Sequence, residues 1–334
     1  MTDMQFIAIS LAAVVVVGVL AYNFILDYRH SKVAQDLIKR APHGDFKETD
    51  PLEPLEETAL PVPDTLLVDP KFEWSVLLDF PNSVRPADLF DDSDTELQLI
   101  LQEIHKPITW VAYDSSMEEW RFIYKGVSDF PIEHLRVNLQ LCNRSGAATP
   151  EDMDAFEDFL EALALKWKAE WDVSDAPVEE IAHSMDRFCA EVDLEIIIRV
   201  LSEKSFNRDT LRSWAEGQGM EYQNQTGDYV LFHSGGGLCY RVEIAAQAGE
   251  SIKSVNFVLD VPCTAHGDEV FNVMVKDAQS FAAQVEGTLV DDKNTPLLPM
   301  QLENIAAQFV ALPQGKMAEI GIPAGSPQAL RLFS

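Results

Sequence analysis

Basic residues are scarce in this 334-residue chain: 25 Lys and Arg stand against 55 Asp and Glu, which gives a formal net charge of −30. Nucleic-acid binding depends on clustered Lys and Arg that neutralise phosphates, so this balance argues against a nucleic-acid partner. It also argues against a soluble region that lies flat on an anionic membrane surface. A basic segment of a partner would be attracted, although solubility alone also accounts for such acidity.

Cysteine is scarce as well. The chain has four cysteines and no Cys-x-x-Cys pair, so neither a small disulfide framework nor a zinc site has the necessary spacing. We therefore expect free, buried thiols in a reducing compartment and no metal. The four are Cys142, Cys189, Cys239 and Cys263.

Signatures of catalysis are missing too. His233 precedes Cys239 across a Ser-Gly-Gly-Gly stretch, but no Lys-Ser or Lys-Thr follows to make a phosphate-binding loop. A hairpin turn explains the same residues. His183 and Asp186 supply a single histidine on a predicted helix, which is too little for a metal site. We therefore expect that the protein is not an enzyme and that it has no catalytic residue and no cofactor. A thiol enzyme with Cys239 as its nucleophile is the rival hypothesis.

One long apolar run is present, at 6–26, reading FIAISLAAVVVVGVLAYNFIL. That length suits a hydrocarbon core of about 30 Å. The preceding residues at 1–5 contain no Lys or Arg, which disfavours a cleaved signal peptide. Arg29, Lys32, Lys39 and Arg40 follow the run, and basic flanks stay cytoplasmic. We predict a single-pass inner-membrane helix with a periplasmic N-terminus at 1–5 and everything after residue 26 in the cytoplasm.

A tether follows the predicted membrane helix. Residues 27–71 begin as a basic juxtamembrane segment and continue as an acidic linker, with six prolines between residues 41 and 71. Proline at this density interrupts helices and strands, so we expect a partly stiff linker. It would hold the rest of the chain close to the membrane.

From residue 72 onward the apolar pattern becomes regular and indicates two similar units, at 72–192 and 193–312. In each we expect a strand, a helix, several strands, a helix, a strand and a helix. This order predicts an α+β fold with an antiparallel or mixed sheet and helices on one face. One large α+β domain is the alternative. The tail at 313–334 is either disordered or docked between the units.

Three stretches of the second unit are distinctive: SVNFVLDVPC at 254–263, GDEVFNVMVKDAQSFAAQVEGTLVDD at 267–292, and MQLENIAAQF at 300–309. They resemble the C-terminal, FtsZ-binding domain of ZipA-type cell-division proteins, a split β-α-β fold. The tail IPAGSPQALRLFS resembles that of beta-proteobacterial variants of this family. The resemblance covers about the last 140 residues, and the unit at 72–192 is interpreted as a diverged second copy.

The resemblance implies that the helix-free face of the second sheet binds the C-terminal peptide of FtsZ and ties the FtsZ ring to the inner membrane at the division site. Ile197, Tyr229 and Leu231 match apolar groove positions of the family, and we include Ala245 and Val258, which stand where the family has a larger apolar residue and an aromatic one. The smaller residues and their polar neighbours imply a face that is smaller and more charged than the family groove. Two alternatives remain: a membrane-anchored scaffold for another division or envelope protein, and peptide binding on the first unit, where Trp110, Trp120 and Phe122 are core or groove residues. The sequence leaves the oligomeric state open.

Overall fold

The computed structural model describes residues 63–90, 94–126, 128–172, 176–234, 236–244 and 251–334. The predicted membrane helix at 6–26, the N-terminus at 1–5 and the linker up to residue 62 lie outside the described residues. Among the residues that are described, no helix is both long and apolar enough to cross a membrane. Residues 60–334 cluster as one compact unit.

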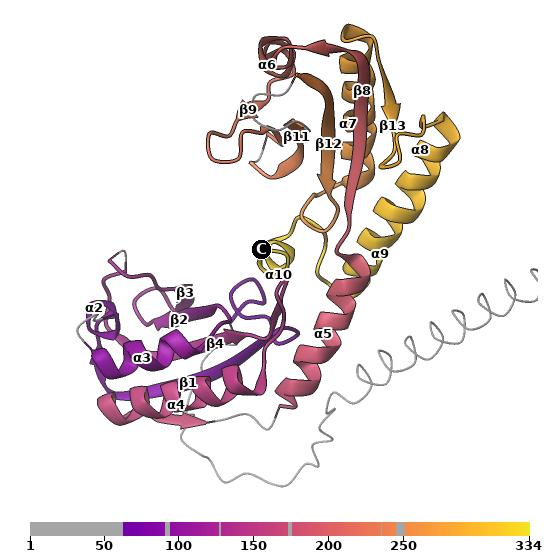
Figure 1. The fold of residues 1–334 in the computed structure, drawn as a ribbon. Coiled ribbons are helices and arrows are strands. Elements are labelled where there is room, and N and C mark those ends of the chain that lie inside the picture. Colours follow the sequence, from indigo (N-terminus) through magenta and orange to yellow (C-terminus); the bar gives the residue numbers. More distant parts are fainter. Residues whose placement is uncertain (1–62, 91–93, 127, 173–175, 235, 245–250) are drawn as a thin grey trace, which may run out of the picture. The chain divides into compact units, whose positions relative to one another are not determined.

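The first sheet contains five antiparallel strands in the order β3-β2-β4-β1-β7 (Figure 1). Two short strands form a separate hairpin after β4, and four helices complete this part of the chain. The strands are β1 (Glu73–Val84), β2 (Ile108–Asp114), β3 (Glu119–Phe122), β4 (Ile132–Gln140), β5 (Cys142–Asn143), β6 (Gly146–Ala147) and β7 (Glu170–Asp172). The helices are α2 (Pro86–Leu89), α3 (Thr95–Glu103), α4 (Pro150–Trp167) and α5 (Val178–Val192).

Alternation along the strands places one face of this sheet against α3 and α4. On β1, Trp74, Val76 and Leu78 are buried and pair across to alternate apolar residues of β4. Phe156 and Phe159 of α4 pack on this face and join the same core cluster. The intervening residues of β1 point to the opposite face of the sheet, because successive side chains of a strand alternate between its two faces.

The second sheet contains six antiparallel strands in the order β13-β8-β12-β11-β10-β9. Helix α7 packs along β8 and β13 (Figure 1) and supplies much of the core. The strands are β8 (Glu195–Phe206), β9 (Glu221–Tyr222), β10 (Tyr229–Phe232), β11 (Leu238–Ile244), β12 (Ile252–Asp260) and β13 (Gly287–Val290). The helices are α6 (Arg208–Gly217), α7 (Gly267–Gln284) and α8 (Pro299–Ile305).

The two sheets share one strand order at their centres. Four strands of the first, β7-β1-β4-β2, correspond in order and direction to β13-β8-β12-β11 of the second. The extra edge strands differ: β3 follows β2 along the chain, whereas β9 and β10 precede β11. The predicted α+β class with antiparallel sheets is confirmed, while descent of the two units from one repeat stays a prediction.

Helical structure continues past residue 312, the predicted end of the second unit. Helix α8 runs through a π-helical segment, η1 (Ala306–Ala311), into α9 (Leu312–Glu319), and α10 (Pro327–Leu332) follows. Pro313 has no N–H to offer the carbonyl of Phe309, and a widened turn is a usual response to such a break. Of the two alternatives for 313–334, the structure shows ordered packing. Tail residues share an apolar cluster with earlier parts of the chain: Phe72, Cys142, Cys189, Val192, Met317, Ile322, Ala329, Leu332 and Phe333.

Candidate peptide-binding site

The helix-free face of the second sheet has a short apolar row across its centre. Ile197 of β8 lies opposite Val258 of β12, which lies opposite Arg241 of β11, which in turn lies opposite Val230 of β10. The side chain of Ile197 is 47% exposed, whereas Val258 is only 1% exposed. The row therefore exposes the side chain of Ile197 to solvent, whereas the neighbouring Val258 is buried.

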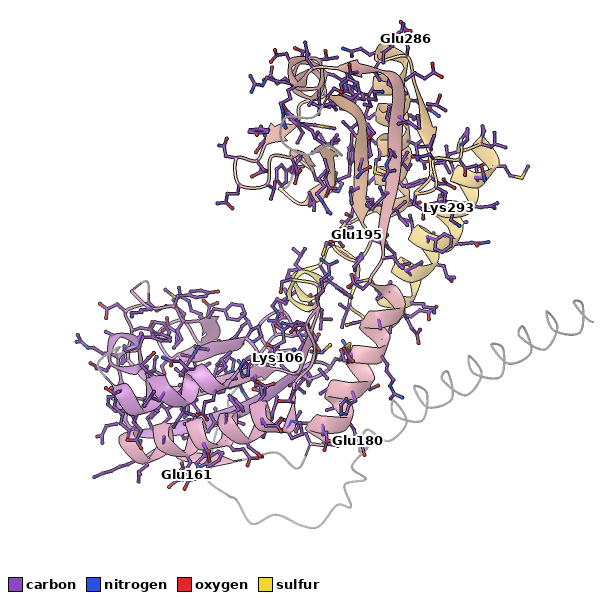
Figure 2. The ribbon with its side chains drawn as sticks, viewed as in Figure 1. Lys106, Glu161, Glu180, Glu195, Glu286 and Lys293 are labelled. Carbon is purple, nitrogen blue, oxygen red and sulfur yellow. The ribbon has the colours of Figure 1, made fainter. Side chains whose placement is uncertain are left out.

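Arg241 explains the burial of Val258. Its Nη2 lies 2.8 Å from Oε1 of Glu195 on β8, and its Nε lies 2.7 Å from Oε1 of Glu243. Since β12 separates β11 from β8, the guanidinium extends across β12 to reach Glu195, which is labelled in Figure 2. An ion-paired arginine thus crosses the centre of the face predicted to bind peptide.

Polar contacts also occupy the two ends of this face. Arg199 Nε donates to Oδ1 of Asn256 at 3.1 Å, and its Nη1 donates to Asn294 at 3.2 Å. At the other end, Asp260 accepts from Nη2 of Arg144 at 2.9 Å. Charged and hydrogen-bonded side chains therefore occupy much of this face.

The predicted site residues do not all share this face. Tyr229 is 4% exposed and pairs with Val242 of the core, and Leu231 packs against the same core cluster. Both side chains therefore face the helices, so their expected placement on the open face is wrong. The β10–β11 register puts Val230 there instead. Ala245 lies outside the described residues.

The missed residue, Val230, could have been found from the parity of β10 once its pairing with β11 was known. The strand reads Tyr-Val-Leu-Phe, apolar at every position, so its sequence alone does not show which side chains face the core. Ile197 and Val258 do lie opposite one another, as their strand parity predicts. A peptide-binding role for these residues stays a prediction.

The helix-free face of the first sheet has a different character. Val111 and Trp120 are buried there, with Leu77, Tyr113 and Phe122 packed around them. Trp110 points the other way and contacts Phe159 of α4 in a T-shaped arrangement. The sequence did not decide whether Trp110, Trp120 and Phe122 are core or groove residues. In the structure, Trp110 belongs to the core beneath α4, whereas Trp120 and Phe122 lie on the helix-free face.

The histidine and cysteine considered for chemistry lie at a hairpin. His233 N donates to the carbonyl of Gly237 at 2.8 Å, which closes the β10–β11 connection. Cys239 is buried, and burial raises the pKa of its thiol, so the nucleophilic thiolate is disfavoured. No group of three potential ligands that could hold a metal occurs in the described part of the chain.

Comparison with known proteins bears on the second sheet. Residues 243–308, from the end of β11 through β12, α7, β13 and α8, match the family model described as ZipA, C-terminal FtsZ-binding domain. The cell division protein ZipA of Vibrio vulnificus, in strains YJ016 and CMCP6, is 35% identical over 60 residues, which is 18% of this chain. The chain thus spans 19% of the length of those relatives. The resemblance predicted from the sequence is confirmed over this stretch: residues 243–308 are similar to the C-terminal FtsZ-binding domain of ZipA.

Proposed function

We propose that this chain is a cell-division protein that binds the C-terminal peptide of FtsZ and does no chemistry of its own. The match of residues 243–308 to the FtsZ-binding domain carries the proposal. That stretch includes β12, which forms the middle of the helix-free face and contributes Val258. The proposed contact surface is therefore built around the matched strand.

On this face the peptide would use one exposed apolar side chain and an acidic surround. Ile197 offers the open apolar surface, while Glu195 and Glu243 supply negative charge beside it. Acidic groups attract a peptide that carries basic residues, and apolar anchors supply most of the affinity. For a peptide to contact Val258, the guanidinium of Arg241 must move aside. We accordingly propose that a single copy of the protein binds the peptide weakly.

Weak binding is compatible with a role at the membrane. The predicted helix at 6–26 and the linker would hold many copies beneath the inner membrane, facing one FtsZ filament. Contacts made in parallel along a filament add through effective concentration. The proposed result is attachment of the filament to the inner membrane at the division site.

The test is fluorescence polarisation of a labelled FtsZ tail peptide titrated with the full chain in mild detergent. We expect saturable binding that Ile197→Ser weakens about tenfold, since loss of an exposed anchor typically costs more than 1 kcal/mol. Met300→Ser is the matched control, because Met300 is an exposed apolar residue of α8, outside the sheet. Absence of saturation at about millimolar protein would contradict the proposal.

A second candidate is a membrane-bound scaffold that binds another division or envelope protein. The ion pairs of Arg241 across the predicted groove favour it, since they leave little open apolar surface for an FtsZ peptide. Affinity capture of the full chain from dividing cells separates the candidates. Recovery of FtsZ, lost in Ile197→Ser, supports the first; recovery of other division proteins without FtsZ supports the second.

A further inference from the structure

The first sheet carries its own apolar centre on the face that has no helix. Val111 of β2 is fully buried and Trp120 of β3 is 7% exposed, although the α3–α4 core lies on the opposite side of the sheet. Tyr113 packs against Trp120 with ring centroids 5.5 Å apart, and Phe122 is opposite Val111. A helix-free sheet face in water is normally polar, so this centre requires a cover.

The cover is a short piece of the chain's own linker. Leu67 and Val68 belong to the same cluster as Val111 and Trp120. Their backbone N–H groups donate to the carbonyl of Asp64 at 2.9 and 3.0 Å, so residues 64–68 close on themselves as a turn and form no strand. The segment therefore rests on the sheet by two adjacent aliphatic side chains, as a bound peptide would.

Within the described part of the chain, few polar contacts join residues 64–68 to the rest of the molecule. Gln328 Nε2 donates to the Thr65 carbonyl at 3.5 Å, and the next firm contact is Asp69 N to Oε2 of Glu73 at 2.6 Å. The segment enters the sheet only at β1, so it can lift away without breaking any strand pairing. Its removal would expose Val111 and Trp120 rather than unravel the sheet.

The apolar surface extends past this cover. Tyr124 is 57% exposed and its ring lies 6.1 Å from that of Phe122, along the free edge formed by β3. Leu66 is 50% exposed beside the covering pair. A cluster that served stability alone would gain from burying these side chains as well. Their exposure fits a surface on which the occupant can be exchanged.

A cation lies at the centre of the same face. Arg136 of β4 pairs across with Leu77 and Val111, and its guanidinium lies 5.5 Å from the Trp120 ring. Nη1 donates to Ser75 at 3.4 Å, but the buried Nε has no hydrogen-bond partner in the part of the chain that is described. A buried donor without a partner is costly, and a hydrogen-bond acceptor on a docked segment would satisfy it.

We propose that the helix-free face of the first sheet is a docking surface for a partner segment that carries two adjacent aliphatic side chains, and that residues 64–68 of this chain compete for it. The chain's own Leu67 and Val68 show the chemistry that the surface accepts. The surface belongs to the first sheet and is independent of FtsZ binding on the second.

Competition sets the expected size of the effect. A tethered segment is present at an effective concentration of about millimolar or above. A partner can bind only the molecules whose face is free, so its apparent association constant is the intrinsic one multiplied by the free fraction. Vacating the face should strengthen binding of any segment of the right chemistry about tenfold or more.

The probe is a fluorescein-labelled synthetic peptide of residues 64–71, DTLLVDPK, titrated by anisotropy against the full chain in mild detergent. We expect L67S/V68S to bind this probe at least tenfold more tightly than the unsubstituted chain. Phe122→Ser in the same background should weaken it about fivefold or more. Leu165→Ser is the matched control, because Leu165 is an exposed aliphatic residue of α4, on the other side of the sheet.

Two outcomes would overturn the docking surface: no saturable binding to L67S/V68S at about millimolar protein, or equal loss in Phe122→Ser and Leu165→Ser. Near-UV circular dichroism verifies folding of each variant. If L67S/V68S does not fold, the single variant Leu67→Ser replaces it, because Leu67 is only partly buried.

Discussion

Glu73, at the start of β1, is a buried carboxylate. Its side chain is 1% exposed, and Nη2 of Arg331 lies 2.7 Å from its Oε2. The contact is an ion pair whose carboxylate is buried. Burial raises the pKa of Glu73, and the positive charge of Arg331 opposes that rise. The pair links β1 to the C-terminal helix α10.

Removing the cation leaves the carboxylate buried and uncompensated. We expect Arg331→Met to lower the free energy of unfolding by about 3 kcal/mol at neutral pH. Methionine keeps an apolar contact with Phe72, over whose ring the guanidinium now lies at 4.9 Å. Urea denaturation measures the loss. The Glu73→Gln/Arg331→Met double variant is the control, and it should lose less than Arg331→Met alone.

The pH dependence of Arg331→Met follows from the direction of the Glu73 shift. A carboxyl whose pKa is raised on folding binds more protons in the folded state, so its contribution to stability falls as pH rises from the unfolded pKa toward the folded one. Loss of Arg331 extends that window to higher pH. The penalty should therefore be larger at pH 8 than at pH 5.5, and an equal penalty at both would contradict this account.

Site residues were predictable where strand parity alone decides direction. Ile197 and Val258 lie on paired, long strands, and parity put them on one face. Tyr229 and Leu231 lie on a four-residue strand that is apolar at every position, so the sequence does not distinguish its two faces. The burial of Val258 was beyond prediction, because Arg241 reaches it from another strand only in the folded sheet.

At the scale of elements, helix α4 shows how local chemistry fixes a boundary. Thr149 Oγ1 accepts from Asp152 N at 3.1 Å, and Asp152 Oδ2 accepts from Thr149 N at 2.9 Å, which is a capping box. Pro150 occupies the first helical position. Hydroxyl, proline and acid stand together in the sequence, so the start of this helix can be predicted from local residues alone.

The cap of α4 also gives a prediction. We expect Thr149→Ala to lower the free energy of unfolding by about 1 kcal/mol, since the N–H of Asp152 loses its acceptor at the helix end. Thr149→Ser keeps the hydroxyl and should retain most of the stability. Thermal unfolding followed by circular dichroism measures both variants. Equal losses in Ala and Ser would show that the methyl group, rather than the cap, matters.

The end of the second unit was not predictable in the same way. Pro313 is a usual stop signal, yet the chain turns through η1 and continues as α9 to Glu319. Tertiary contacts explain the difference: Gln314 Nε2 donates to the carbonyls of Val261 and Thr264 at 2.8 Å, and Met317 is fully buried. A local rule predicts where a helix ends only when nothing distant stabilises its continuation.

At the scale of the whole molecule, the C-terminal residues unite elements that are far apart in sequence. Phe333 and Leu332 pack with Phe72, Cys142 and Cys189, and Gln140 Nε2 donates to the carbonyl of Arg331 at 2.9 Å. Nothing periodic in IPAGSPQALRLFS announces these contacts, which is why the sequence left the tail open between disorder and docking. The tail acts as part of the core.

Leu332→Ser tests whether the tail is part of the core, with cysteine reactivity as the measurement. The tail packs against Cys142 and Cys189 but not in the cluster that contains Cys239. Truncating a buried leucine costs about 3 kcal/mol, enough to raise local opening about a hundredfold. Cys142 and Cys189 share the cluster with Leu332, whereas Cys239 lies in the core of the second sheet. We expect thiol labelling, mapped by mass spectrometry, to accelerate at least tenfold at Cys142 and Cys189 and to stay slow at Cys239. Equal acceleration at all three would mean that the substitution unfolds the second sheet as well, and unchanged labelling would mean that the tail does not cover the cluster.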